Sequence, residues 1–476
     1  MEFSKKVLVA GAGISGIGAA DLLLKLGAQV ILYDGNEKLD KEAVRSKFAP
    51  EAAIEIWKGE LTAEMASQAE LCVISPGIPL EVPFVKVLQE AQVPIWSEIE
   101  LAYRAGKGKL AAITGTNGKT TTTALVGEIF ANAAESAFTV GNIGIPYTQE
   151  ALNMRDDSLT VVECSSFQLE TIIDFKPEVS AILNITEDHL DRHKTMENYA
   201  RIKENIAKNQ DSDGACVLNY EDERLREFGS QLKIPVIFFS SARKLEEGIF
   251  LDDGMIVLKQ GEKRIEFVKT EEMNIIGPHN YENAMAAVAM AWAIGIDVEI
   301  IRKTLREFKA VEHRIEYVTE KQGVVYYNDS KGTNPDAAIK AVQAMTRPTI
   351  LIAGGYDKQI PYAPLAPKIL EKVKILILMG DTAQKIEDAI AAEIAPEVIN
   401  AVTASMGKLG TKRQKTCNCG LQMYRAKSME EAVTIAHLCA MEGDIIALSP
   451  ASASFDMYKD FEERGNHFKE LVMKLK

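Results

Sequence analysis

One local unit recurs three times along the chain and strongly limits its fold. In each copy, a short apolar run rich in β-branched residues leads into a glycine turn, and a helical pattern follows. The copies cover residues 5–34, 109–130 and 347–360. Strands that alternate with helices pair in parallel and are covered by those helices, so the sequence predicts an α/β fold with parallel sheets. Ligands of such folds bind at the carboxyl ends of the strands.

The length of the chain and the spacing of these units predict three domains. A chain of 476 residues is too long for one hydrophobic core. An amphipathic helix ends in a Gly-Lys-rich link at 96–109, and a helix gives way to a new strand at 308–318. The polar, basic residues 396–426 are expected to form a surface excursion of the last domain. We therefore expect domains at 1–98, 99–310 and 311–476.

Composition and charge argue against several classes of protein. The chain is 47% hydrophobic and 26% charged, and its longest apolar stretch, 283–296, is shorter than the ~18–20 residues that span a membrane. The net charge of −14 disfavours nucleic acid, whose phosphates bind clusters of Lys and Arg. We expect a cytoplasmic monomer that neither binds nucleic acid nor inserts into a membrane.

The six cysteines are scattered, which suits free thiols in a reducing compartment. Cys417, Cys419 and Cys439 lie close in sequence to His437, and a metal site could be imagined there. The Cys-x-Cys spacing is wrong for a zinc ribbon, however, and a metal site is the less favoured interpretation.

The first glycine turn, GAGISG at 11–16, matches the G-x-G-x-x-G pattern after a strand and before a helix. Asp34 ends the next strand, where an acid that binds a ribose is expected. The pattern predicts a nucleotide-like group at a helix N-terminus, where free N–H groups face an anion. It leaves three alternatives open: a dinucleotide cofactor, as in an NAD(P)-dependent oxidoreductase, another nucleotide, or a turn that serves packing only.

The second glycine turn, GTNGKTTTT at 115–123, is a stronger signal for bound phosphate. In this arrangement backbone amides surround phosphate oxygens, the lysine reaches the β- and γ-phosphates and the next hydroxyl holds Mg²⁺. Ile113 stands where the standard P-loop has its first glycine, so the loop is a shortened variant; the alternative is an exposed turn. The predicted ATP-binding residues are Gly115, Thr116, Asn117, Gly118, Lys119, Thr120 and Thr121.

Polar side chains follow two further predicted strands. Glu163 ends the first, and Asn184 ends the second, with His189 just beyond. Carboxylates at strand ends beside a phosphate loop suit Mg²⁺, which prefers oxygen ligands. A lone histidine after a strand is more often a hydrogen-bonded cap, so both interpretations of His189 stay open.

Further motifs extend over nearly the whole chain: SPGIP, GNIG, ECSSFQLE, LNITEDHLDRH, GPHNYENAMAA, HRIE, NDSKGTN, AGGYDK and SPASASFDMYKDFEERGNHF. Together with the two glycine turns they resemble the Mur ligase family. The resemblance implies a Rossmann-like N-terminal domain for a UDP-bearing substrate, a central P-loop ATPase-type domain with a parallel sheet, and a Rossmann-like C-terminal domain. The motifs SSFQLE and SPASASFDMYKDFEERGNHF favour the members of the family that add D-glutamate.

The resemblance also implies an activity and its cofactors. ATP would phosphorylate the terminal carboxylate of UDP-N-acetylmuramoyl-L-alanine, and the amine of D-glutamate would attack the acyl phosphate to form an amide, in peptidoglycan precursor synthesis. Transfer of a phosphoryl group to an anion needs cations, so Mg²⁺ and Lys119 are expected to supply most of the catalysis.

The site residues that the resemblance implies fall into four groups. Catalytic residues are Lys119, Glu163, His189 and Lys203. Metal ligands are Thr120, Glu163, His189 and Lys203, of which Lys203 would carry a carbamate; without the resemblance, it is interpreted as part of a solvated helix face. Further ATP contacts are Asn280, Asn283, Arg314 and Asp329. Substrate contacts are Ile14, Ser15, Asp34, Gly77, Asn142, Ser165 and His189 for the UDP-bearing substrate, and Lys331, Thr333, Lys358, Ser454 and Phe461 for D-glutamate. Gly35 and Asn36 depart from the pattern of some relatives, which puts uridine contacts there in doubt.

Overall fold

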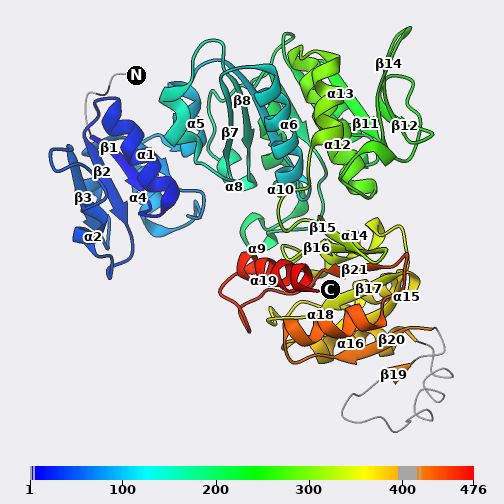
Figure 1. Cartoon of the computed structure of the whole chain (residues 1–476). Coiled ribbons are helices and arrows are strands. Elements are labelled where there is room, and N and C mark those ends of the chain that lie inside the picture. The colour runs from blue at the N-terminus through cyan, green and yellow to red at the C-terminus, as the bar shows by residue number, and fades with distance from the viewer. Residues whose placement is uncertain (1–2, 4–5, 395–414, 417–419, 476) are drawn as a thin grey trace. The chain divides into compact units, whose positions relative to one another are not determined.

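The computed structural model describes residues 3, 6–394, 415–416 and 420–475. Its described part contains three sheets flanked by helices, and the predicted α/β class is confirmed (Figure 1). The chain forms two compact units, one of residues 1–269 and 282–306, the other of residues 270–281 and 307–476. The first unit contains two sheets, so the boundaries of the three domains expected from the sequence stay predictions.

The first sheet is parallel throughout, with strand order β3-β2-β1-β4-β5. The GAGISG turn joins β1 to α1 and needs its glycines, because a side chain at Gly16 would overlap the carbonyl of Gly11. The elements are β1 (Lys6–Ala10), α1 (Ile14–Lys25), β2 (Val30–Asp34), α2 (Lys41–Arg45), β3 (Ile54–Lys58), α3 (Ala63–Ala66), β4 (Ala69–Ile74), α4 (Pro83–Glu90), β5 (Ile95–Ser97) and α5 (Glu98–Ala105).

The second sheet has the order β14-β13-β12-β11-β10-β9-β6-β8-β7. Seven neighbouring strands, β12-β11-β10-β9-β6-β8-β7, pair in parallel, as predicted. The sheet continues beyond β12 into the antiparallel strands β13 and β14. The strands are β6 (Lys109–Thr114), β7 (Ala137–Gly141), β8 (Leu159–Glu163), β9 (Val179–Ile182), β10 (Ala215–Asn219), β11 (Val236–Ser240), β12 (Gly248–Asp252), β13 (Met255–Gln260) and β14 (Lys263–Lys269).

The position of β6 decides what surrounds the phosphate loop. This strand lies between β8 and β9, so the loop that follows it is flanked by the carboxyl ends of both neighbours. Between the loop and residue 307 the chain forms the α-helices α6 (Lys119–Ala133), α7 (Tyr147–Glu150), α8 (Ser166–Leu169), α9 (Leu190–His193), α10 (Met196–Glu204), α11 (Glu223–Gln231), α12 (Pro278–Ile294) and α13 (Val298–Glu307).

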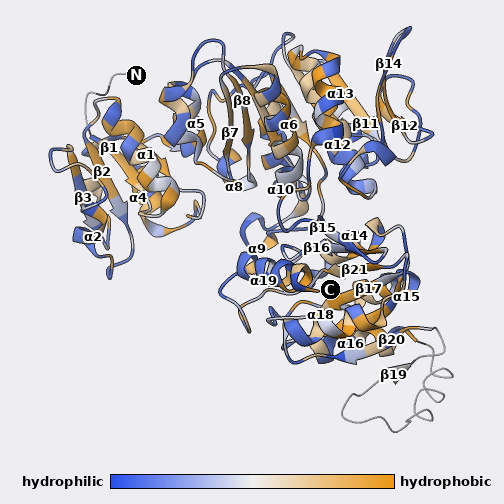
Figure 2. Ribbon diagram, viewed as in Figure 1, coloured by the Kyte–Doolittle hydropathy of each residue, from blue (hydrophilic) through white to orange (hydrophobic). Residues whose placement is uncertain are grey.

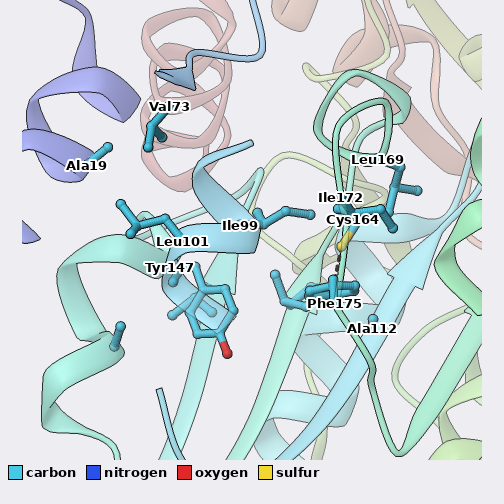
Figure 3. Packing of buried hydrophobic residues seen from close by; sticks show 14 of the residues in the cluster. Ala19, Val73, Ile99, Leu101, Ala112, Tyr147, Cys164, Leu169, Ile172 and Phe175 are labelled. Atoms are coloured by element: carbon cyan, nitrogen blue, oxygen red, sulfur yellow. Dashed lines mark hydrogen bonds between the residues drawn. The ribbon is translucent and has the colours of Figure 1, made fainter. Parts of the chain in front are cut away.

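One cluster of buried apolar residues extends from the first sheet to the second (Figure 3). Val73 of β4 belongs to it, as do Ile99 and Leu101 of α5, Tyr147 of α7 and Ala112 of β6. Burial of apolar surface is the main favourable contribution to folding, and a shared core resists separation. The helix α5, which begins at the expected boundary between the first two domains, therefore packs into a core that both sheets share.

The third sheet lies in the second unit and has the order β15-β16-β21-β17-β18-β20-β19. Two apolar clusters pack against it, and its central strands β17, β18 and β21 are markedly more hydrophobic than the surrounding loops (Figure 2). The elements are β15 (Glu316–Lys321), β16 (Val324–Asn328), α14 (Pro335–Ala344), β17 (Thr349–Ala353), α15 (Ala366–Lys372), β18 (Val373–Leu378), α16 (Ala383–Glu393), β19 (Lys415–Thr416), β20 (Gln422–Arg425), α18 (Met429–Cys439), β21 (Ile445–Leu448) and α19 (Phe461–Lys474).

Some sequence predictions fall outside the described residues. They include most of the expected surface excursion, together with Cys417 and Cys419. His437 is described, and its Nδ1 lies 2.7 Å from the hydroxyl of Tyr326, a hydrogen bond within the second unit. Among the described residues, none of the helices has the length and apolar character needed to cross a bilayer.

Glu98, the first residue of α5, carries a buried carboxyl group. Its Oε1 accepts a hydrogen bond from Nε2 of Gln168 at 2.6 Å, and its Oε2 is buried with no partner among the described residues. Burial raises the pKa of Glu98 from 4.5 to about 7, against the lowering effect of the Gln168 bond.

We expect Glu98→Gln to be more stable than the parent protein at pH 8. The carboxyl group of Glu98 keeps its proton to a higher pH in the folded protein than in the unfolded chain, so the free energy of unfolding falls as pH rises from 4.5 through about 7. A neutral amide removes this loss while its oxygen can still accept from Gln168, for a gain of up to about 3 kcal/mol at pH 8 and little at pH 4.5. Urea unfolding at several pH values measures the difference.

Glu100 on the same helix gives a matched control. It is fully buried, and its carboxylate accepts the backbone N–H groups of Ile173, Asp174 and Phe175, each at 2.9 Å. Glu100→Gln replaces one acceptor oxygen with a donor and should destabilise the protein at every pH. A Glu98→Gln variant that is no more stable than the parent at pH 8 contradicts the prediction.

Candidate active site

The phosphate loop lies between β6 and α6 and is held by the neighbouring strand end. The backbone N–H of Asn117 donates to Oδ1 of Asn184 at 2.8 Å, and Nδ2 of Asn184 donates to the carbonyl of Asn117 at 3.1 Å. Gly118 is the N-cap of α6 with a left-handed φ of 87°, and a side chain there would overlap Oδ1 of Asn283. The loop therefore has a fixed conformation with a helix N-terminus at its end, which favours anions.

Lys119, the first residue of α6, lies against this loop. Its Nζ donates to the carbonyl of Gly115 at 2.8 Å and to that of Thr116 at 2.9 Å. A flexible lysine can exchange such carbonyl bonds for bonds to phosphate oxygens. The cation and the helix terminus are thus arranged to bind the same anion.

Glu163, at the end of β8, is 1% exposed and sits beside the loop strand, with Ile113 of β6 as its register partner. Its Oε1 accepts from Nδ2 of Asn142 at 2.9 Å, and its Oε2 is buried with no partner among the described residues. An unpaired buried carboxylate oxygen is costly unless a cation binds it. This oxygen therefore fits a Mg²⁺ ligand, the role predicted from the sequence.

Lys203 on α10 is 2% exposed, so its interpretation as part of a solvated helix face is wrong. Its Nζ donates to the carbonyl of Gly115 at 2.9 Å and lies 3.4 Å from Oγ1 of Thr114. Burial, and then the charge of Lys119, lowers the pKa of Lys203 well below its usual value. A buried amine of lowered pKa is the form of lysine that reacts as a nucleophile.

His189 precedes α9 and is half exposed. Its ring contacts the edge of Phe167 at a centroid distance of 5.0 Å, and its Nε2 lies 3.5 Å from Oδ2 of Asp188. Its backbone N–H donates to Oδ1 of Asp188 at 2.9 Å. The imidazole is accessible to a ligand, and its role as a metal ligand stays a prediction.

Four of the predicted UDP-substrate contacts lie at the carboxyl edge of the first sheet. Asp34 ends β2; its Oδ2 accepts the N–H of Ala12 at 3.0 Å and its Oδ1 that of Asn36 at 2.9 Å. Ile14 is 75% exposed at the start of α1, next to Ser15, and Gly77 is exposed in the loop after β4. These residues follow adjacent parallel strands, so they share one edge of the sheet.

Ser165 and Asn142 belong to the second sheet. Ser165 caps α8 in a capping box, in which Oε1 of Gln168 lies 2.8 Å from its N–H and 3.0 Å from its Oγ. Asn142 follows β7, and its N–H donates to the carbonyl of Glu163 at 2.9 Å. The side chains of both residues are thereby held in defined positions beside the strand that ends in Glu163.

The remaining predicted contacts lie in the second unit, except Asn283, which belongs to the first. Most of them follow the neighbouring parallel strands β16, β21 and β17: Asp329, Lys331 and Thr333 after β16, Ser454 after β21, and Lys358 after β17. Asp329 accepts from Oγ of Ser449 at 2.6 Å, and burial raises its pKa to about 7 although Arg314 lowers it. Nζ of Lys331 lies 5.2 Å from the ring centroid of Phe461.

A second group of possible metal ligands in this unit is already occupied by protein partners. Glu312, His313 and Glu316 offer ligand atoms within 4.8 Å of one another. Glu316 pairs with Lys469 at 3.2 Å, Glu312 also pairs with Lys469, and Nδ1 of His313 lies 2.9 Å from Nδ2 of Asn328. The cluster is therefore satisfied without an ion.

Comparison with known families accounts for most of the chain. Residues 5–97 match the model described as "Mur ligase MurD-like, N-terminal domain", residues 113–291 the "Mur ligase middle domain", and residues 313–452 the "Mur ligase, glutamate ligase domain". The chain belongs to the Mur ligase family. It is thus a ligase, and ATP is the nucleotide that Mur ligases consume.

Curated Mur ligases resemble the chain along its whole length. The UDP-N-acetylmuramoylalanine–D-glutamate ligase of Lachnospira eligens is 50% identical over 472 residues, which cover 99% of each chain. The protein of the same name from Lachnoclostridium phytofermentans is 48% identical and covers 99% of this chain and 98% of its own. This kinship leaves the oxidoreductase alternative without support.

Solved structures of other Mur ligases have the same fold. UDP-N-acetylmuramate-alanine ligase MurC from Thermotoga maritima aligns with a TM-score of 0.57 at 19% identity, over 99% of this chain and 100% of that one. MurF from Acinetobacter baumannii aligns with a TM-score of 0.59 at 15% identity, over 100% and 95%. The predicted three-domain α/β architecture is confirmed by these neighbours.

Sequence reasoning missed Arg464, which organises the second unit of this Mur ligase. It is 2% exposed and donates to the carbonyls of Ser330, Ala453 and Ser452 at 2.8, 3.0 and 3.1 Å, and to Oγ of Ser330 at 3.0 Å. Burial lowers its pKa to about 10. Arg464 holds together the loops after β16 and β21, which carry Lys331 and Ser454; its acceptors are mainly backbone atoms, so no residue pattern signals them.

Proposed function

We propose that this Mur ligase joins D-glutamate to UDP-N-acetylmuramoyl-L-alanine with consumption of ATP, in peptidoglycan precursor synthesis. The observation that carries the proposal is the 50% identity, along essentially the whole chain, to a curated ligase that bears this name. The buried carboxylate of Glu163 beside the phosphate loop supports it, because it offers an unused oxygen to a cation. We further propose that the enzyme is a cytoplasmic monomer.

In the proposed reaction, a carboxylate oxygen of the alanyl group attacks the γ-phosphorus and ADP leaves. The amine of D-glutamate then attacks the carbonyl carbon of the acyl phosphate, phosphate leaves and the amine loses a proton. Activation is needed because a carboxylate is a poor acyl donor. Two anions meet in the first step, so cations must offset their repulsion.

The proposed cations come from the phosphate loop and its neighbours. Lys119 exchanges its loop carbonyls for phosphate oxygens and stabilises the charge that develops during transfer. Mg²⁺, when bound, neutralises charge on the phosphates, and Thr120, Glu163, His189 and a carbamate on Lys203 are its proposed ligands. Lys203 suits this role because its amine is buried with a lowered pKa beside the carbonyl of Gly115.

The substrate contacts are proposed from the resemblance and from their positions at strand ends. Ile14, Ser15, Asp34, Gly77, Asn142, Ser165 and His189 are assigned to the UDP-bearing substrate. Asn280, Asn283, Arg314 and Asp329 are assigned to ATP. Lys331, Thr333, Lys358, Ser454 and Phe461 are assigned to D-glutamate, whose two carboxylates suit the lysines and the Ser454 hydroxyl.

The substrate assignment predicts a strong preference between glutamate enantiomers. With ATP, Mg²⁺ and UDP-N-acetylmuramoyl-L-alanine, phosphate release should require D-glutamate and stay at background with L-glutamate. A site that orders two carboxylates and one amine fixes chirality, because the mirror image can place only two of the three groups. A coupled phosphate assay measures the rates; equal rates with both enantiomers contradict the assignment.

A further inference from the structure

Arg192, on the short helix α9, contacts two separate parts of the first unit. Its Nη1 donates to the carbonyl of Pro76 at 2.8 Å and its Nη2 to that of Ile78 at 3.0 Å, in the loop after β4. The same guanidinium pairs with Glu170 through Nη2–Oε2 at 2.5 Å and Nε–Oε1 at 3.3 Å. Both side chains are only 10% exposed, so this bidentate pair is well shielded from solvent.

The two carbonyls that Arg192 binds flank Gly77. In a trans peptide the C=O and the following N–H point in opposite directions, so binding the Pro76 carbonyl turns the N–H of Gly77 away from Arg192. Within residues 75–79, the N–H of Ser75 donates to the carbonyl of Ala10, and the N–H of Ile78 donates to the carbonyl of Ser75. The two prolines of this segment have no N–H group. Among the described residues, the N–H of Gly77 has no acceptor.

A second unused donor lies in the same loop. The hydroxyl of Ser75 is buried without a partner among the described residues, and it lies next to Gly11 and Gly16 of the GAGISG turn. An unpaired N–H at the carboxyl edge of a parallel sheet, beside a helix N-terminus, suits the anionic or carbonyl oxygens of a nucleotide. The exposed Gly77 therefore offers a donor at the edge that is expected to receive the UDP-bearing substrate, and the buried hydroxyl of Ser75 lies below it against the GAGISG turn.

The partners of Arg192 connect this loop to the phosphate-loop side of the unit. Glu170 is the C-cap of α8, whose N-cap is Ser165. The guanidinium lies over the ring of Phe167 at 4.2 Å, and the same ring contacts those of His189 at 5.0 Å and His193 at 5.4 Å. One charged group thus fixes the loop of Gly77 against the segments that carry Ser165 and His189.

We propose that Arg192, oriented by Glu170, is a positioning residue for the UDP-bearing substrate. It touches no reacting atom; it holds the Pro76–Ile78 loop so that the N–H of Gly77 faces the nucleotide, and it sets the distance from that loop to the segments of Ser165 and His189. This inference rests on the proposed function. Lysine cannot replace Arg192, because a single ammonium group cannot reproduce the guanidinium fork that binds two carbonyls and a carboxylate.

The test compares Arg192→Lys and Arg192→Met with the parent enzyme by calorimetric titration of UDP-N-acetylmuramoyl-L-alanine and by steady-state kinetics. Both variants should bind the UDP-bearing substrate at least about tenfold more weakly than the parent. Without Arg192 the Pro76–Ile78 loop becomes ordered only on binding, and the cost of ordering it reduces the free energy of binding. The KM for ATP should change less than about twofold, and kcat at saturating substrate should largely persist. Hydrogen exchange of residues 75–79 should be faster in both variants.

Arg201→Lys is the matched control, because Arg201 is exposed on α10 and donates to Oδ1 of Asn198 at 2.8 Å, a bond that does not involve the carbonyls of Pro76 and Ile78. It should leave all these quantities unchanged. Glu170→Gln keeps the size of the side chain and removes the charge that orients Arg192, so it should also weaken binding of the UDP-bearing substrate. It provides the test if the Arg192 variants fail to fold.

The outcomes separate this inference from the function on which it rests. Folded variants that bind the substrate within twofold of the parent overturn it, as does a loss of kcat with unchanged substrate affinity. In either case a parent enzyme that remains specific for D-glutamate keeps the proposed function intact. A parent enzyme that fails to bind UDP-N-acetylmuramoyl-L-alanine overturns the function and the inference together.

Discussion

Replacement of Lys119 by alanine is expected to lower phosphate release by about 10³-fold, since one preorganised cation at a phosphoryl-transfer site contributes this order of magnitude. The ammonium already lies at the loop, 2.8 Å from the Gly115 carbonyl, so little reorganisation is needed to reach a phosphate. Affinity for the UDP-bearing substrate should persist, because four of its seven predicted contacts follow strands of the first sheet, and the other three, Asn142, Ser165 and His189, do not include Lys119. A phosphate-release assay measures the loss of activity, and calorimetric titration measures the retained affinity for the UDP-bearing substrate.

Lys107→Ala is a suitable control for this experiment. Its side chain is 60% exposed and pairs with Asp156 at 3.2 Å, and an exposed pair of this kind contributes little to stability. The control should retain full activity. If Lys119→Ala loses affinity for both ATP and the UDP-bearing substrate, the assignment of the two nucleotides to different sheets is wrong.

Replacement of Lys203 by alanine is expected to lower activity by about 10²-fold or more, with partial recovery in formate or acetate. If the lysine carries a carbamate, the variant lacks a carboxylate beside the phosphate loop, and a small carboxylate can diffuse into the space left by the side chain. The recovery should follow the size of the anion, with formate better than acetate and acetate better than butyrate. Initial rates at several anion concentrations measure it.

Lys119→Ala again supplies a contrast, because it lacks a cation and should not respond to carboxylates. Circular dichroism and thermal unfolding establish that Lys203→Ala is folded, since the buried amine also bonds the Gly115 carbonyl. A folded, inactive variant that no carboxylate restores contradicts the carbamate role.

The phosphate loop was predictable because its signal is contiguous. Glycines, a lysine and a hydroxyl residue between a strand and a helix define the loop without knowledge of the remaining fold. The place of Glu163 was also predictable, since the ends of adjacent parallel strands meet at one edge, and β8 does pair with β6. These features depend on local order and on one topological rule.

Lys203 and Arg192 show where sequence reasoning stops. The burial of Lys203 depends on a loop 88 residues earlier in the chain, and the segment around it is polar enough to suggest a solvated helix. Arg192 binds carbonyls more than 100 residues away, and every residue has a carbonyl, so its partners leave no pattern. The core that the first two sheets share through α5 is also nonlocal, and a composition change at 96–109 does not reveal it.

The bonding of Arg464 has a consequence for how this edge of the third sheet can evolve. Three of its four acceptors are main-chain oxygens, which remain in place whatever side chains positions 330, 452 and 453 carry. A substitution at Ser330 removes only the fourth bond, to its Oγ, and a substitution that fits the buried sites 452 or 453 removes none, so the anchor of the loops that flank the predicted amino-acid site does not depend on one side-chain acceptor. Diversification of the accepted amino acid then depends on the conservation of a residue that never meets it.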